Sequence, residues 1–257
     1  MKYVELTLST PEANLAGDEV LLDRCEEGQE EEVIRFWEPG DHIIVLGYSG
    51  RVEEEVHLPH WHRRPVPILR RCSGGGAVVQ GPGCLNYALV LRIRDNESLS
   101  TVTQANAYIM QQHKQALLPL LGPTVSIQGS TDLTLGGLKF SGNSQRRRRH
   151  CLLFHGTFLL DFDLEWIETL LPDPPQQPYY RQHRAHRDFL TNLNVAAPQI
   201  KDALKTCWKA SHELTSVPLD AIRKSADEKY ANPDWHIHVA SKAIYPGRSA
   251  STQIPTE

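Results

Sequence analysis

The chain has 257 residues, of which 40% are hydrophobic, and a formal net charge of −4. This length suits one large domain or one domain with a small appendage, and the apolar content excludes wholesale disorder. The slight negative charge argues against a dedicated nucleic-acid binder. Five cysteines without a Cys-x-x-Cys pair predict reduced thiols in a cytoplasmic protein. Neither a signal peptide nor a transmembrane helix is expected.

The first predicted helix follows a short strand at residues 3–8. Thr10 is a typical N-cap and Pro11 suits the first helical position, so we expect a helix that reaches about Cys25. Two strands, 33–37 and 42–47, should follow, joined by a turn at 38–41.

The segment 52–64 is polar and carries three histidines, His57, His60 and His62. Such a group could suggest a metal site. No cysteine or carboxylate partner stands at metal-ligand spacing, which favours a surface loop.

The most informative stretch is Arg70–Val78, with the sequence RRCSGGGAV. Glycines let the backbone approach a ligand closely, successive amides can cradle an anion, and arginine forks suit phosphate or carboxylate. The pattern is neither GxGxxG nor GxxxxGK[ST], so neither a Rossmann nor a Walker site is indicated. A flexible loop is the alternative. Cys72 is either a reactive thiol beside the arginines or a small side chain that fills space.

The rest of the chain alternates strands and helices. We expect strands at 87–94 and 151–162, helices at 101–121, 199–214 and 219–230, a proline-rich connector at 172–178 and a loose tail from about Ala240. Strands outnumber helices and are mixed with them. The sequence therefore predicts an α/β (α+β) fold with helices packed on a β-sheet.

Residues 132–141 predict a β-hairpin with a two-residue turn, Gly136-Gly137. This register pairs Leu135 with Leu138 and places Lys139 across from Thr134 and diagonal to Asp132. From spacing alone, the lysine and the carboxylate are most simply an exposed salt bridge, worth at most about 1 kcal/mol.

Several motifs in their order along the chain resemble the lipoate-protein ligase family. They are Asn14–Glu19, Arg70–Val78, Gly83–Tyr87, Asp132-Leu133, Leu138–Gln145, His155–Leu160 and Thr191–Leu193. The resemblance covers roughly residues 3–210. It implies a mixed, largely antiparallel β-sheet flanked by helices, similar to class II aminoacyl-tRNA synthetases and biotin ligases. It also implies a catalytic domain over 1–214 and a short helical extension with a loose tail over 215–257.

The resemblance further implies ATP-dependent activation of lipoate to lipoyl-AMP, with Mg²⁺, and transfer to a carrier lysine. The carrier would be a lipoyl domain of a 2-oxo-acid dehydrogenase or the glycine-cleavage carrier protein. Lys139 would be the catalytic residue and would contact the acyl carboxylate and the α-phosphate. The implied nucleotide and adenylate contacts are Arg71, Ser73, Gly74, Gly75, Gly76, Ala77, Val78 and Val79. The implied acyl, nucleotide or Mg²⁺ contacts are Asp132, Ser141, Gly142, His155 and Gly156, and the acyl slot would include Leu46 and Val78.

Alternatives remain. Octanoyl or lipoyl transferases of this fold carry a catalytic cysteine, either before the lysine segment, matching about 124–130, or near Pro172; this chain has none in either place. That favours the ligase, because a thioester needs a thiol. A non-catalytic binding module would keep the fold without binding ATP. Residues 146–149, four arginines, are either a solvated loop or a landing patch for an acidic carrier. Since many ligases of this family have a second domain, a small accessory protein is expected to complete the site.

Overall fold

The computed structural model describes residues 1–174 and 177–236. The helices are α1 (Pro11–Glu26), α2 (Val52–Glu55), α3 (Leu58–Arg63), α4 (Val102–Leu121), α5 (Glu165–Leu170), α6 (His186–Phe189), α7 (Ala197–Cys207), α8 (Leu219–Ser225) and α9 (Pro233–His236). A π-helical turn, Ala226–Tyr230, continues α8, and short 3₁₀ turns lie at Ile93–Asp95, Glu97–Leu99 and Tyr179–Arg181.

The strands are β1 (Lys2–Glu5), β2 (Val33–Trp37), β3 (Ile43–Leu46), β4 (Ile68–Arg70), β5 (Val78–Gln80), β6 (Cys84–Arg92), β7 (Val125–Gln128), β8 (Asp132–Leu135), β9 (Leu138–Arg147), β10 (Cys151–Leu159) and β11 (His212–Glu213). Eight of them form the main sheet in the order β11-β1-β2-β6-β10-β9-β8-β7, and the other three form a small sheet, β4-β3-β5. In the main sheet β1 runs parallel to β2 and β11, and the remaining neighbours are antiparallel. The predicted mixed, largely antiparallel sheet flanked by helices is confirmed.

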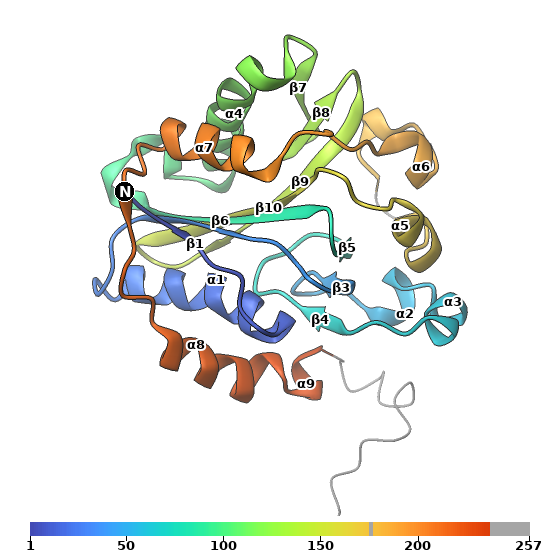
Figure 1. The fold of residues 1–257 in the computed structure, drawn as a ribbon, viewed down its shortest axis with the longest axis horizontal. Coiled ribbons are helices and arrows are strands. Elements are labelled where there is room, and N and C mark those ends of the chain that lie inside the picture. Colours follow the sequence, from blue (N-terminus) through green and yellow to red (C-terminus); the bar gives the residue numbers. More distant parts are fainter. Residues whose placement is uncertain (175–176, 237–257) are drawn as a thin grey trace, which may run out of the picture.

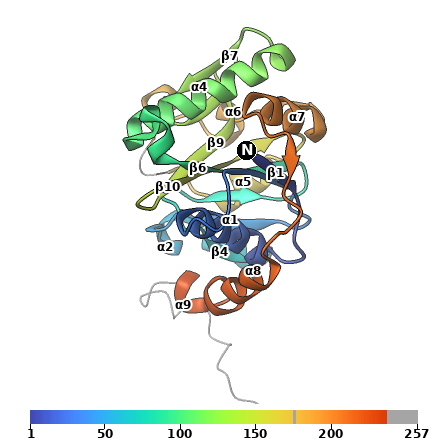
Figure 2. The same ribbon diagram turned by 90° about the vertical axis from the view of Figure 1, so that its left-hand side faces the viewer.

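Helices cover both faces of the main sheet (Figure 1). Helices α4 and α7 lie on one face, over a core that includes Tyr87, Phe154 and Phe158. Helix α1 lies on the other face, with α8 outside it, and the small sheet sits beside α1 (Figure 2). Two layers of helices thus enclose the central strands β6 and β10, which are almost wholly buried.

Local signals set the helix boundaries as predicted in several places. Thr10 caps α1 by accepting a hydrogen bond from the Ala13 amide at 3.2 Å, and Thr101 caps α4 in the same way through Gln104. Gly122 ends α4 with a positive φ of 78°, a conformation that glycine adopts at little cost.

One expected helix boundary was wrong. The helix expected over 199–214 ends at Cys207, because Lys209 takes a left-handed φ of 51° and the chain then adds β11 to the main sheet beside β1. The strands 33–37 and 43–46 do follow one another, but they belong to different sheets. The loose tail expected from Ala240 lies outside the described residues. Across 1–174 and 177–236, no helix is long and apolar enough to cross a membrane.

Candidate active site

A β-bulge arranges the polar face of the main sheet. Thr134 pairs with Lys139 as predicted, but Leu133 pairs with Ser141, so β9 has one extra residue there. One extra residue reverses the alternation of side chains beyond it. Accordingly, a Cβ built on Gly142 would lie 3.1 Å from the Lys139 ammonium nitrogen. Lys139, Gly142 and Ser144 therefore follow one another along the same face of β9.

Lys139 meets Asp132 on this face, as the hairpin geometry predicts. Its ammonium nitrogen lies 2.8 Å from Asp132 Oδ1, with 26% and 14% of the two side chains exposed. The other carboxylate oxygen, Oδ2, accepts a 2.7 Å hydrogen bond from the Tyr180 hydroxyl. Burial, together with the Asp132 charge and this hydrogen bond, raises the Tyr180 pKa. The ammonium is thus paired but still open to solvent on one side.

Arg71 lies inside the glycine-rich loop (residues 71–77) and holds it together. Its Nη2 donates to the carbonyl oxygens of Gly74 at 2.5 Å and Gly76 at 3.0 Å, and its Nη1 donates to Val45 at 3.2 Å. Its Nε donates to Ser73 Oγ at 3.1 Å. Burial lowers the Arg71 pKa to about 10, which still leaves it charged at neutral pH. In this state the guanidinium shapes the loop; phosphate binding by Arg71 stays a prediction.

Arg70 has a different position from the one that the sequence suggests. Its guanidinium is buried and donates to backbone carbonyl oxygens of two segments, Gly47, Tyr48 and Gly50 on one side and Trp235 and His236 on the other, at 2.7–3.0 Å. This arginine therefore joins parts of the chain rather than facing a ligand.

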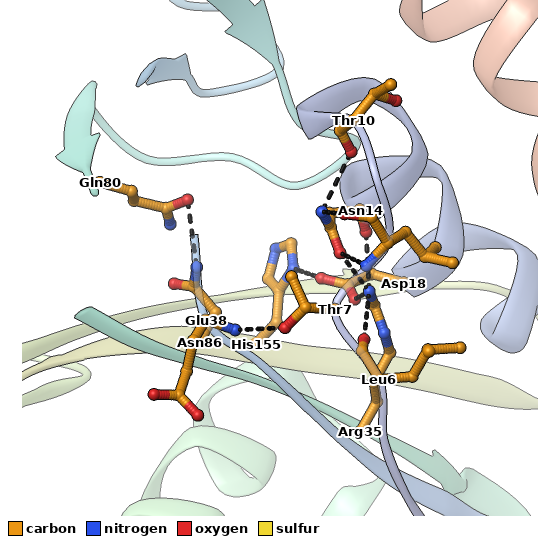
Figure 3. Close-up of polar contacts among 11 residues, drawn as sticks. Leu6, Thr7, Thr10, Asn14, Asp18, Arg35, Glu38, Gln80, Asn86 and His155 are labelled. Carbon is orange, nitrogen blue, oxygen red and sulfur yellow. Dashed lines mark hydrogen bonds and ion pairs between the residues drawn. The ribbon is translucent and has the colours of Figure 1, made fainter. Parts of the chain in front are cut away.

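A buried chain of polar groups connects the glycine-rich loop to α1. Ser73 Oγ lies 2.5 Å from His155 Nε2. His155 Nδ1 lies 3.3 Å from Asp18 Oδ2 (Figure 3). Asp18 in turn forms a 2.6 Å ion pair with Arg35, whose other guanidinium nitrogen bonds to Asn14 Oδ1. Since Arg35 and Asp18 are both almost fully buried, each compensates the desolvation of the other.

A second set of contacts fixes the other side of the glycine-rich loop. Glu55 Oε2 accepts a hydrogen bond from the Ala77 amide at 2.5 Å, and Ser144 Oγ donates to the Gly74 carbonyl at 2.9 Å. Gly47 packs directly on the loop, since a Cβ there would lie 1.8 Å from the Gly75 carbonyl oxygen. Any other residue at position 47 would displace the loop.

The structure brings some predicted residues together and separates others. Lys139, Asp132, Gly142 and His155 lie on the polar face, beside the glycine-rich loop. Ser141 pairs with Phe158 of the opposite, apolar face. Gly156 lies between Tyr87 and Asn143, and the Asn143 side chain passes over it to accept a 2.6 Å hydrogen bond from the Tyr87 hydroxyl.

Leu46 and Val79 are buried in the core beneath α2 and α5, and Val78, which is partly buried, packs on the core beneath α1. Glu55, Asp18 and Tyr180 were not predicted; Asp18 lies in a matched motif, which could have indicated it.

Two other groups that the sequence singles out, the arginines 146–149 and the three histidines of 52–64, mostly form contacts within the chain. In the run 146–149, Arg146 lies over the Tyr48 ring, Arg147 donates to the carbonyls of Leu99 and Ser100, and Arg148 pairs with Glu19 and Asp23. Three of the four arginines are thus engaged within the chain, so the run does not form a landing patch of four free arginines.

The three histidines lie in and around α3, where His57 and His60 stack and His60 contacts the Thr169 carbonyl. Among residues 1–174 and 177–236, no cluster of three or more His, Cys, Asp or Glu side chains is placed to hold a metal ion.

The chain belongs to the family of the lipoyl protein ligase A/B catalytic domain, whose sequence model matches residues 10–208. The octanoyltransferase LipM of Bacillus subtilis is 24% identical over 91% of this chain and 97% of its own length.

One similar solved structure is from a bi-partite lipoate protein ligase of Thermoplasma acidophilum and its E2 lipoyl domain. Its TM-score is 0.76 and its sequence identity is 22%, and the match covers 91% of this chain and 95% of that one. A lipoate-protein ligase A bound with ATP has the same TM-score and 23% identity, with coverages of 92% and 98%. The fold and the family are thus established, and the family includes both ligases and transferases.

Proposed function

We propose that this chain is a lipoate-protein ligase, which activates lipoate with ATP to lipoyl-AMP and transfers the lipoyl group to a carrier lysine. The observation that carries this proposal is the Lys139 ammonium, held 2.8 Å from Asp132 next to Gly142 and the glycine-rich loop. Adenylation brings a carboxylate up to a triphosphate, and these two anions repel. A positioned ammonium between them offsets this repulsion and stabilises the charge that develops in the transition state.

The glycine-rich loop would bind the phosphate and the acyl carboxylate. The backbone from Ser73 to Val79 would line the nucleotide, and Arg71 would supply positive charge from within the loop. No serine or cysteine nucleophile is needed, because lipoate attacks the α-phosphate directly and pyrophosphate leaves. The carrier lysine then attacks the acyl carbonyl, and AMP leaves. The solved lipoate-protein ligase A with bound ATP supports a nucleotide at this site.

Magnesium ion fits this site only as a companion of the nucleotide. Both carboxylate oxygens of Asp132 are engaged, one by Lys139 and one by Tyr180. Mg²⁺ is commonly held by one or two carboxylates plus substrate phosphates and waters. Asp132 is a single carboxylate with these two contacts, so it would hold the ion only together with the triphosphate. The ion would offset part of the phosphate charge.

A transferase that uses an acyl-thioester donor is the second candidate, supported by the likeness to LipM. Its chemistry requires an accessible thiolate. Cys72, Cys84 and Cys151 are buried, and burial raises the pKa of Cys72 and of Cys84 to about 12. Burial also raises the pKa of Cys151. These thiols favour the ligase over the thioester route.

The proposed acceptors are lipoyl domains of 2-oxo-acid dehydrogenases or the glycine-cleavage carrier protein. The Thermoplasma protein is described as part of a bi-partite ligase with an E2 lipoyl domain, which supports both a lipoyl acceptor and a small accessory protein.

The test separates the two half-reactions. Purified chain is incubated with ATP, Mg²⁺ and lipoate, with pyrophosphate and lipoyl-AMP measured; transfer from preformed lipoyl-AMP to a lipoyl domain is measured separately. The proposal expects both reactions, with slow adenylation if an accessory protein is needed. Transfer only from an octanoyl thioester, with no use of ATP or lipoyl-AMP, would overturn it.

A further inference from the structure

The residues that follow the catalytic fold pack back on it as a C-terminal clamp (residues 219–236). Glu19 of α1 is buried and anchors the clamp, since it accepts hydrogen bonds from Lys229 Nζ at 2.6 Å and from the Tyr230 hydroxyl at 2.8 Å. His236 Nε2 contacts the Tyr230 carbonyl, which fixes α9 against the preceding π-helical turn. The clamp is thereby fastened to α1 independently of the glycine-rich loop.

From this anchored position, α9 bonds to the strand that leads into the glycine-rich loop. The backbone carbonyls of Trp235 and His236 accept from the Arg70 guanidinium at 2.8 and 2.7 Å. The Arg70 amide donates to His236 Nδ1 at 2.9 Å, and the Trp235 indole N–H donates to the Arg70 carbonyl at 2.9 Å. Both the backbone and the side chain of Arg70 are therefore held by two consecutive residues.

Arg70 carries this restraint to the turn after β3. Its Nη1 donates to the carbonyls of Gly47, Tyr48 and Gly50. The same turn reaches the glycine-rich loop, because the Tyr48 amide donates to the Ser73 carbonyl at 2.7 Å. Glu55 accepts from the amide that follows the turn, Arg51, at 3.2 Å, and also from the Ala77 amide.

We infer that α9 is a positioning element of the active site, which sets the conformation of the glycine-rich loop through Arg70 and the turn 47–50. Hydrogen bonds, together with the backbone of the turn 47–51, connect α9 to Ser73 and to Ala77 of the loop. A loop of three glycines loses much conformational entropy when it is ordered, so it needs such external restraints to stay in one conformation. The inference rests on the proposed function only for its effect on ligands; the loop's order is measurable without them.

Two truncations test this inference with a matched control. One chain ends at His236 and keeps the whole clamp. The other ends at Asn232 and differs from the first only by the loss of α9. We expect amide hydrogen exchange of residues 73–77 to be about tenfold or more faster in the shorter chain, while exchange in β6 and β10 stays the same in both. Affinity for lipoyl-AMP should fall about 10- to 100-fold in the shorter chain alone, because the loop that lines it is misplaced.

Point variants of the full-length chain give a second test that does not depend on the folding of a truncated chain. Trp235→Phe removes the indole donor and keeps an aromatic ring. His236→Ala removes the acceptor for the Arg70 amide, and His236→Asn offers a carbonyl oxygen instead. The loop should exchange faster in the first two and recover in the third.

Equal exchange of residues 73–77 in the two truncated chains would overturn the inference, whatever the enzyme does. A full chain that forms no lipoyl-AMP, yet shows the α9-dependent exchange, would instead overturn only the proposed function.

Discussion

His155 Nε2 lies 2.5 Å from Ser73 Oγ, and this contact joins the central strand β10 to the glycine-rich loop. Ser73 Oγ also accepts from Arg71 Nε. The Asp18 carboxylate, which is paired with Arg35, can only accept, so His155 Nδ1 donates to it. In the neutral imidazole that carries its hydrogen at Nδ1, Nε2 accepts from the Ser73 hydroxyl. The buried Asp18–Arg35 pair thus selects one tautomer of His155, and that tautomer orients the hydroxyl of Ser73.

Replacing Ser73 with alanine tests the strength of this contact. Ser73→Ala removes the shared partner of Arg71 Nε and His155 Nε2, two buried groups. We expect a loss of about 1–3 kcal/mol in the free energy of unfolding, measured by urea titration, because unpaired buried polar groups lose their water without compensation. Ser216→Ala, at an exposed position, is the control and should change little. A value equal to that of the control would mean that the Ser73 contact adds nothing to stability.

Lys139→Ala should abolish adenylation and leave the fold intact. We expect a decrease of about 100-fold or more in pyrophosphate release, as for other preorganised groups that stabilise transition-state charge. Because the ammonium is partly exposed, the melting temperature should change little. Lys224→Ala, at an exposed position of α8, is the control and should retain full activity. An unchanged rate in Lys139→Ala would remove this residue from the active site.

No thioester should form on this chain. Incubation with octanoyl carrier protein, followed by intact-mass measurement before and after hydroxylamine, should give no octanoyl adduct. The buried Cys72 has its pKa raised to about 12, so very little thiolate exists at neutral pH. A hydroxylamine-sensitive adduct on Cys72 or Cys151 would favour the transferase instead.

Stability should decrease at acidic pH through His113. This side chain is fully buried against Tyr87, Phe154 and Trp208, and burial lowers its pKa to about 3. Since the unfolded chain binds the proton near pH 6.5 and the folded chain does not, stability is lost as pH falls below 6.5, by about 1.4 kcal/mol per pH unit.

Between pH 7.5 and 5, the parent chain should therefore lose about 2 kcal/mol more than His113→Leu in urea unfolding. His212→Leu, at an exposed position, should behave like the parent. Parallel pH profiles for the parent and His113→Leu would show that His113 titrates alike in both states.

The hairpin of β8 and β9 that carries Lys139 could be predicted from the sequence because a two-glycine turn fixes its register. The Thr134–Lys139 pair and the Asp132 contact follow from that turn. The bulge beyond it could not be predicted, since no local signal marks which residue is extra. Yet the bulge decides that Gly142 and Ser144 share the face of Lys139.

Contacts between distant segments account for the other differences. Arg70 looks like a ligand-binding residue in the sequence, but its partners at 235 and 236 are about 165 positions away and leave no local pattern. Glu55 stands among other acidic residues and gives no sign that it holds the Ala77 amide. The glycines and the lysine indicate where the candidate site is, whereas the fold decides which neighbouring charges shape it.

The position of β1 between β2 and β11 bears on how the chain is made. β2 is synthesised soon after β1, whereas β11 follows only after most of the sheet has left the ribosome. At about 5–20 residues per second, the outer edge of β1 stays unpaired for on the order of ten to forty seconds. An unpaired edge can pair with other strands, including those of a neighbouring nascent chain. The two residues of β11, 212–213, end this exposure because they pair with β1 and become the edge strand of the sheet.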